Sequence, residues 1–272
     1  MPASILKNKT ALVTGASSGI GREIAQLLAE RGARVFGTAR NPQSATPIPG
    51  VEMIAMDVTD DASVAGAVRS IVQKAGPIHF VVNNAGYGLT GAVEETSLAE
   101  ARQQFETNFF GTLRVTNAVL PEMRRAGFGR FANISSVVGF LPAPFMSMYS
   151  ASKHAMEGYT ESLDHEVRRF GVRALLIEPS FTKSNISHSG KDAELRLDDY
   201  SVQRDLILQA TRNGIATGDD PRLVAETVFT ALTASSPRLR YPVGKGVTLS
   251  RLRRFLPAGV FDRAIRKQFQ LN

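Results

Sequence analysis

A tyrosine and a lysine, Tyr149 and Lys153, stand four residues apart in the segment YSASKHAMEGYTESLDHEVRRFG, whose pattern predicts a helix. On a helix, this spacing places both side chains on one face. A free phenol has a pKa of about 10, and a nearby ammonium group lowers that pKa toward the range of efficient proton exchange. The pair is therefore a candidate for acid–base chemistry, although surface pairs with this spacing are also common.

A serine thirteen residues before the tyrosine strengthens this interpretation. Ser136 ends the segment GRFANISS, a predicted strand, so its hydroxyl is expected at the carboxyl edge of a sheet where the tyrosine helix begins. A hydroxyl there can hydrogen-bond a substrate carbonyl or the alcohol formed from it. Ser135 is the neighbouring alternative, because alternate residues of a strand point to opposite faces.

The glycine-rich segment TGASSGIG, residues 14–21, joins the first strand-like segment to the first helical one. Its glycines permit positive φ and let backbone N–H groups approach an anion, and the following helix contributes its positive end. Tight strand-to-helix turns need glycine anyway, but this position is the one that dinucleotide binding requires. The candidate cofactor-binding residues of this turn are Gly15, Ser17, Ser18, Gly19, Ile20 and Gly21.

The second predicted strand, ARVFGTA, is followed by an arginine, Arg40. Dinucleotide-binding chains often carry a carboxylate in this neighbourhood, which accepts a hydrogen bond from the ribose 2′-hydroxyl of NAD. A guanidinium would instead bind the 2′-phosphate of NADP with two hydrogen bonds. No acid accompanies Arg40, so the sequence predicts a preference for NADP(H). The alternative is an exposed loop arginine, and Arg22 either adds positive charge or faces solvent.

The elements that must position these residues alternate between strand-like and helical as far as Pro179, with one long helical stretch over 97–127. The strand-like segments are nearly all apolar, which is typical of a parallel sheet covered on both faces. Right-handed crossovers then give an α/β fold, a Rossmann-like doubly wound parallel sheet with helices on both faces, as a single domain over 1–272. Ligands of such folds bind beyond the carboxyl ends of the strands, where these motifs lie.

Composition excludes several classes of protein. The chain has 272 residues, 43% of them apolar, and no cysteine, which excludes disulfides, thiolate catalysis and sulfur-ligated metals. The four histidines have no metal-ligand spacing, so no metal site is expected. The net charge of +7 comes from residues 238–272, which hold nine Lys/Arg and one acid, while residues 1–237 are nearly neutral. Because the body of the chain carries no excess of positive charge, no nucleic-acid partner is expected. The start of the chain lacks a long apolar segment, and a cytoplasmic protein is expected.

Together these motifs resemble the short-chain dehydrogenase/reductase family over residues 9–182. The resemblance includes TGASSGIG, NNAG at 83–86, Asn108 in FETNFFG, Ser136 in NISSVVG, and YSASK at 149–153, in the family's order and spacing. The segments NAGYGLTGAVEE and RYPVGKG are similar to the branch with 17β-hydroxysteroid and retinol dehydrogenase-like members.

The resemblance implies an oxidoreductase that interconverts alcohols and carbonyls. Tyr149 would be general acid in reduction and base in oxidation, and Ser136 would position the substrate oxygen. Lys153 would tune the tyrosine and bind the nicotinamide ribose, and Asn108 would support a water-linked proton relay. An intact set of these residues argues against a non-catalytic NADP(H)-binding sensor, the first alternative function.

The resemblance also assigns further residues to the cofactor. Besides Tyr149 and Lys153, they are Asp57 and Val58 at the adenine ring, Asn83, Asn84, Ala85 and Gly86 beyond the fourth strand, and Pro179 and Thr182 on the nicotinamide side. The chain departs from the family at His79, where an aspartate is common, and at Ser180, where a glycine often follows the proline. We expect His79 to affect a structural contact rather than catalysis.

Apolar residues cluster in the loops around the predicted site, although some of them must belong to the core. They are Tyr87, Leu89, Phe140, Leu141, Pro142, Phe145, Met146, Met148, Phe181 and Ile186. They predict a small hydrophobic alcohol or carbonyl substrate. The polar segment 183–220 is a candidate substrate lid.

The basic C-terminal extension, 248–272, places Phe261, Ile265 and Phe269 on one side of a predicted helix. We favour packing of this helix on its own domain or on a partner subunit. The alternative is a peripheral contact with an anionic membrane, which would make the protein a membrane-surface adaptor. A homodimer or homotetramer is expected, because the family associates through the helices that contain Asn108 and Tyr149.

Overall fold

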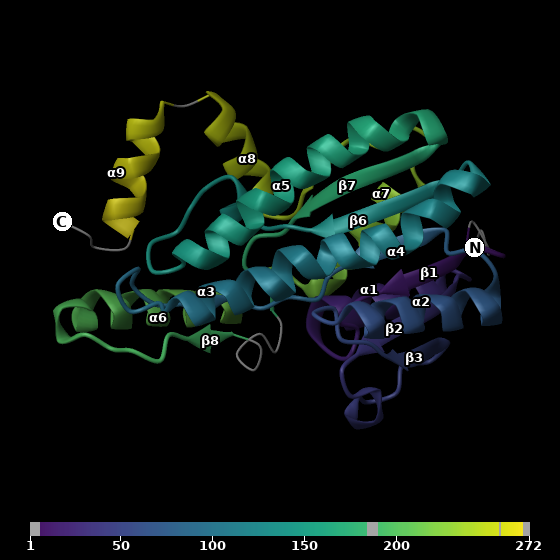
Figure 1. Ribbon diagram of the computed structural model, residues 1–272. Coiled ribbons are helices and arrows are strands. Elements are labelled where there is room, and N and C mark those ends of the chain that lie inside the picture. The colour runs from purple at the N-terminus through teal and green to yellow at the C-terminus, as the bar shows by residue number, and fades with distance from the viewer. Residues whose placement is uncertain (1–5, 184–189, 256, 269–272) are drawn as a thin grey trace.

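The computed structural model describes residues 6–183, 190–255 and 257–268. Within these residues, parallel strands form a seven-stranded sheet in the order β3-β2-β1-β4-β6-β7-β9 (Figure 1). The strand order reverses between β1 and β4, as in a doubly wound sheet. This confirms the predicted fold class. The strands of the sheet are β1 (Thr10–Val13), β2 (Arg34–Ala39), β3 (Val51–Ala55), β4 (Phe80–Asn83), β6 (Gly129–Ile134), β7 (Val172–Glu178) and β9 (Arg240–Pro242).

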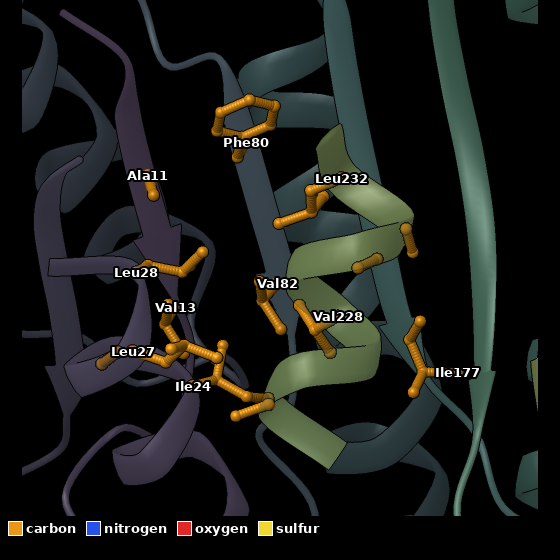
Figure 2. Packing of buried hydrophobic residues seen from close by; sticks show 14 of the residues in the cluster. Ala11, Val13, Ile24, Leu27, Leu28, Phe80, Val82, Ile177, Val228 and Leu232 are labelled. Atoms are coloured by element: carbon orange, nitrogen blue, oxygen red, sulfur yellow. The ribbon is translucent and has the colours of Figure 1, made fainter. Parts of the chain in front are cut away.

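Helices cover both faces of the sheet, which explains why most residues of its central strands are apolar and buried. On one face, Ile24 and Leu28 of α1 pack with Val228 of α7 over Val13 and Val82 (Figure 2). On the other face, α2, α4 and α5 enclose a second buried cluster. The covering helices are α1 (Gly19–Glu30), α2 (Asp61–Ala75), α4 (Gly111–Ala126), α5 (Ser147–Val167) and α7 (Pro221–Thr233).

The helical stretch expected over 97–127 forms, but a π turn interrupts it. A capping box of Ser97 and Glu100 starts α3 (Leu98–Phe105), and the π turn Glu106–Phe110 then leads into α4. Asn108, inside this turn, is 1% exposed. π turns are frequent at functional sites, and this one directs an amide side chain into the protein.

The remaining elements gather on the side of the sheet away from the N-terminus (Figure 1). The short strands β5 and β8 pair with each other in parallel. None of the described helices combines the length and apolar character needed to cross a membrane. These elements are β5 (Leu89–Thr90), β8 (Lys191–Asp192), α6 (Ser201–Ala216), α8 (Gly246–Phe255) and α9 (Ala258–Gln268).

A buried ion pair attaches α6 to the segment after β5. The guanidinium of Arg204 donates to Glu95, and the two side chains are 9% and 0% exposed. The carboxylate of Glu95 also accepts hydrogen bonds from the backbone N–H groups of Ala92 and Leu197, both at 2.9 Å. The lid assigned to 183–220 remains a prediction, and its residues 184–189, with Ile186, lie outside the described residues.

Arg204→Ala is expected to lower the free energy of unfolding by about 3 kcal/mol, because it leaves the buried Glu95 carboxylate without its cation. Denaturant unfolding measures this loss. The matched control is Arg196→Ala, which removes an ion pair to Asp192 whose side chains are 46% and 41% exposed. It is expected to cost less than about 1 kcal/mol. Equal losses in the two variants would contradict the prediction.

Candidate active site

The glycine-rich turn after β1 has the shape of an anion cradle. Gly15 and Gly19 have φ values of 66° and 54°, which favour glycine, and a Cβ at Gly21 would overlap the carbonyl oxygen of Gly15. The side chain of Ser18, the N-cap of α1, does not cap the first N–H groups of this helix. An open helix N-terminus beside a glycine turn fits a dinucleotide phosphate.

The NNAG segment is joined to this turn. The Oγ1 atom of Thr14 accepts hydrogen bonds from the backbone N–H groups of Asn84 and Ala85, both at 2.9 Å. The amide of Asn84 donates to the carbonyl oxygens of Thr14 and Gly15 at 2.9 and 3.2 Å. Asn83 instead lies inside the sheet, where its amide donates to Asn133 Oδ1 at 2.8 Å. Of the two asparagines, only Asn84 therefore contacts the glycine turn.

Arg40 lies exposed just beyond β2, at the carboxyl edge of the sheet. The hydrogen bonds from Thr59 lower the pKa of Asp57, and the charge of Arg40 adds to this effect, so the two side chains lie near each other. Val58 is buried against Gly111. Arg22 donates to the carbonyl oxygens of residues 46 and 47, at 2.6 and 3.0 Å, which fixes the loop after Arg40.

Tyr149 and Lys153 both come from the start of α5. Lys153 Nζ donates to the carbonyl oxygen of Ile134 at 2.7 Å and lies 5.8 Å from the centre of the Tyr149 ring. Burial lowers the pKa of Lys153 to about 8, and the charge of Glu157 opposes this. Burial raises the pKa of Tyr149, and a hydrogen bond with Ser136 opposes this. The predicted tyrosine, lysine and serine are thus brought together.

The two neighbouring serines point in different directions. Ser135 is 2% exposed, and its hydroxyl donates to the carboxylate of Glu157 in the interior. Ser136 shares a hydrogen bond with Tyr149, and its Oγ accepts from the N–H of Val138 at 3.3 Å. Of the two alternatives, Ser136 is therefore the serine that faces the tyrosine.

Asn108 joins the segment after NNAG to the tyrosine helix. Its Oδ1 accepts from the N–H of Tyr87 at 3.0 Å, and its Nδ2 donates to the carbonyl oxygen of Tyr87 at 2.9 Å. The same Nδ2 lies 3.4 Å from Ser152 Oγ, next to Lys153. These contacts give the Asn108 side chain a fixed place beside the site.

The turn after β7 forms without a glycine. The carbonyl oxygen of Pro179 accepts from the N–H of Val137 at 3.0 Å. Ser180 Oγ donates to Asp219 at 3.0 Å, and Thr182 Oγ1 donates to the carbonyl oxygen of Ser180 at 3.1 Å. Asp219, which the sequence analysis did not single out, therefore holds the turn through Ser180. His79 makes the expected structural contact: its Nδ1 accepts from the N–H of residue 10 at 3.1 Å.

The apolar residues predicted around the site divide between core and surface. Leu89 is 3% exposed and belongs to the core, whereas Phe181 is 41% exposed. Phe145 has a φ of 58°, strained for a non-glycine residue, and its ring lies 6.1 Å from the ring of Tyr200. The N–H of Gly91 donates to the carbonyl oxygen of Phe145 at 2.8 Å, so the loop before Tyr149 is fixed in place.

The C-terminal helices lie against this same loop. Phe261 of α9 is 8% exposed, and Arg253 of α8 covers its ring and donates to the carbonyl oxygen of Phe140 at 3.3 Å. These contacts agree with packing of the tail on its own domain, while Phe269 lies outside the described residues. A mostly apolar cavity of about 540 Å³ separates α9 from the loop and α5; it is lined by Pro142, Ala143, Pro144, Ser147, Ser150, Ala151, His154, Asp262 and Ile265.

A buried group of charges behind the site was missed by the sequence analysis. Glu157, four residues after Lys153, and Glu178, at the end of β7, both bind Arg240 of β9. The helical spacing from Lys153 is the only sequence signal for Glu157. Nothing local in the sequence indicates that Arg240 lies beside it.

Comparison with known proteins agrees with this geometry. The model of the short chain dehydrogenase family matches residues 9–195. A 3-ketodihydrosphingosine reductase from Bacteroides thetaiotaomicron is 37% identical over 263 residues, which cover 94% of this chain and 96% of that protein. The chain belongs to the short-chain dehydrogenase/reductase family, as its motifs predict, and is an oxidoreductase of this class.

Solved structures support the same assignment. A short-chain dehydrogenase from Streptomyces avermitilis matches with a TM-score of 0.83 and 33% identity, over 98% of this chain and 97% of that one. A short-chain dehydrogenase from Burkholderia cenocepacia, in complex with NADP, has a TM-score of 0.77 and 26% identity, over 95% of this chain and 98% of that one. A short-chain dehydrogenase/reductase from Burkholderia phymatum, in complex with NAD, has the same TM-score and 24% identity, over 92% of each chain. Both of these neighbours thus hold a nicotinamide dinucleotide.

Proposed function

We propose that this protein is an NADP(H)-dependent oxidoreductase that interconverts an apolar alcohol and its ketone or aldehyde. The observation that carries the proposal is the position of Tyr149, hydrogen-bonded to Ser136 and one helical turn from the buried Lys153. This group lies at the carboxyl edge of the sheet, at the same edge as the glycine-rich turn.

The proposed chemistry divides proton and hydride transfer. The nicotinamide, when bound, supplies the hydride in reduction and accepts it in oxidation. Ser136 orients the substrate oxygen by hydrogen bonding. Tyr149 donates its proton to that oxygen in reduction and removes a proton from the alcohol in oxidation. Lys153 stabilises the phenolate electrostatically, and Asn108 supports the relay that returns the proton.

The preference for NADP(H) is supported by the charge at the end of β2. Arg40 is exposed where it can reach a 2′-phosphate. Asp57, although near it, is hydrogen-bonded to the N–H and hydroxyl of Thr59, at 2.9 and 2.7 Å. The residues proposed to hold the remainder of the cofactor are those of the glycine turn, Val58, Asn84, Ala85, Gly86, Tyr149, Lys153, Pro179 and Thr182.

A ketone with a long apolar chain is the proposed substrate class. The Bacteroides relative is named for such a ketone, and the half-buried apolar residues before Tyr149 would favour one here. The test follows NADPH consumption with a series of 3-ketones of increasing chain length. We expect kcat/KM to rise with chain length, by about threefold per methylene. No turnover of any member, or the fastest turnover of the shortest and most polar ketone, would contradict the proposal.

Three further features remain proposals. A homodimer or homotetramer, formed through α4 and α5, is tested by sedimentation equilibrium, and a cytoplasmic location by cell fractionation.

A peripheral membrane contact is supported by Leu252 and Phe255, which are 41% and 80% exposed within the basic extension. Co-sedimentation with anionic vesicles, but not with neutral ones, would support this contact; no binding to either would contradict it.

A further inference from the structure

Three residues of α5 contact the end of β6 in succession. Tyr149, Lys153 and Glu157 follow one another at intervals of four residues, so they share one face of the helix. Each binds a different group at the end of the strand; in order, these are the hydroxyl of Ser136, the carbonyl oxygen of Ile134 and the hydroxyl of Ser135. The proposed reaction uses the first two contacts and leaves Glu157 unexplained.

A partly buried cluster of charges anchors Glu157 from the other side. Its Oε2 accepts a hydrogen bond from Arg240 of β9. The same guanidinium binds Glu178 of β7 and Glu161 of α5, each at 2.5 Å. Glu157 and Glu178 are 5% and 0% exposed. Glu157 thus has a donor on each of its two oxygens, and moving it away from Ser135 would disrupt the whole cluster.

The charge of Glu157 also acts on Lys153. Burial alone would favour the neutral amine, and the carboxylate of Glu157 opposes that effect. Burial, together with the charge of Glu157, raises the pKa of Glu178 to about 7. Within the described parts of the chain, the charged groups that face Glu157 are Lys153, Glu161, Glu178 and Arg240.

We propose that Glu157 is a positioning residue, which holds the end of β6 and the ammonium group of Lys153 in the arrangement that Tyr149 requires for proton transfer. This inference rests on the proposed function. Glu157 acts through Lys153 and through the strand end that carries Ser136, and Arg240 keeps its carboxylate in place.

The test compares Glu157→Gln with Glu161→Gln. Both variants remove one carboxylate that binds Arg240 from α5, but the Glu161 side chain is 45% exposed. Glu157→Gln is expected to lower kcat for NADP⁺-dependent alcohol oxidation about tenfold at neutral pH and to move the acidic limb of the pH profile about one pH unit upward. The reason is that less Lys153 is charged, so less Tyr149 is ionised. Glu161→Gln is expected to keep kcat within about twofold of the wild-type value and to leave the acidic limb in place.

A purely structural role predicts a lower melting temperature with an unchanged kcat and pH limb, and this result would overturn the proposal. Ser135→Ala removes one anchor of Glu157 and retains every charge. It is expected to shift the limb in the same direction by a smaller amount, and it replaces Glu157→Gln if that variant does not fold. An unmoved limb in Ser135→Ala would then count against the proposal.

A spectroscopic measurement separates this inference from the proposed function. Ultraviolet difference titration follows tyrosine ionisation, and subtraction of the Tyr149→Phe titration isolates Tyr149. Glu157→Gln is expected to raise the pKa of Tyr149, and an unchanged pKa would overturn the role of Glu157. If the wild type turns over neither ketones nor alcohols, the proposed function fails, and this titration alone decides the role of Glu157.

Discussion

Tyr149→Phe is expected to lower the rate of NADPH-dependent ketone reduction by about 10²–10⁴-fold, because it removes the hydroxyl that donates the proton and retains the ring. The hydrogen bond with Ser136 is lost as well, so the substrate oxygen loses part of its orientation. Steady-state kinetics measures the rate. Fluorescence titration with NADPH should show only a small loss of affinity, since Tyr149 is one of many residues proposed to hold the cofactor and the cradle at the glycine turn does not involve its hydroxyl.

The matched control for this prediction is Tyr159→Phe. Tyr159 lies ten residues further along the same helix, where its ring packs edge-on against the ring of Phe109 and burial raises the pKa of its hydroxyl. Its loss is expected to change stability but not the rate per folded molecule. If Tyr149→Phe retains more than about a tenth of the wild-type rate, Tyr149 is not the general acid.

Arg40→Asp is expected to weaken NADPH binding about a hundredfold, because it removes a charge-assisted contact to the 2′-phosphate and adds a like charge. NADH has no phosphate at this position, so its affinity should stay the same or improve. The measurement is a fluorescence titration of both cofactors against wild type and variant.

Arg34→Asp is the control for Arg40→Asp. It changes the net charge by the same amount at the opposite, N-terminal end of β2, where Arg34 lies over the ring of Phe36. It should leave the preference between the two cofactors unchanged. Equal binding of NADPH and NADH by the wild type would remove the proposed role of Arg40, as would equal losses in the two variants.

Several features of the fold and the site follow from the sequence because they depend on neighbouring residues. The apolar strands predict a doubly wound sheet, since such strands must be covered on both faces. The glycine turn is local as well, because only glycine adopts the positive φ of Gly15 and Gly19 readily. The spacing of Tyr149 and Lys153 fixes their common face once the helix forms.

Other features depend on how distant segments pack. Strand alternation requires one of the two serines to face the cleft, but Glu157 beneath the strand decides that Ser135 turns inward. The long helical pattern over 97–127 gives no sign of the π turn, whose inward amide is held by the backbone of Tyr87. Leu89 is apolar and lies in a loop near the site, as expected of a pocket residue, yet it is buried in the core.

The cluster around Arg240 shows the difference most clearly. Arg240 binds Glu157 and Glu178 across sequence separations of 83 and 62 residues. In the sequence it belongs to the basic segment 238–272, where nothing local indicates a buried partner. Only the pairing of β9 with β7 brings it beside the tyrosine helix. The periodicity of the chain determined the sheet, the helices and the residues that can do chemistry; tertiary packing decided which charges meet behind them, because a buried charge requires a partner wherever the chain supplies one.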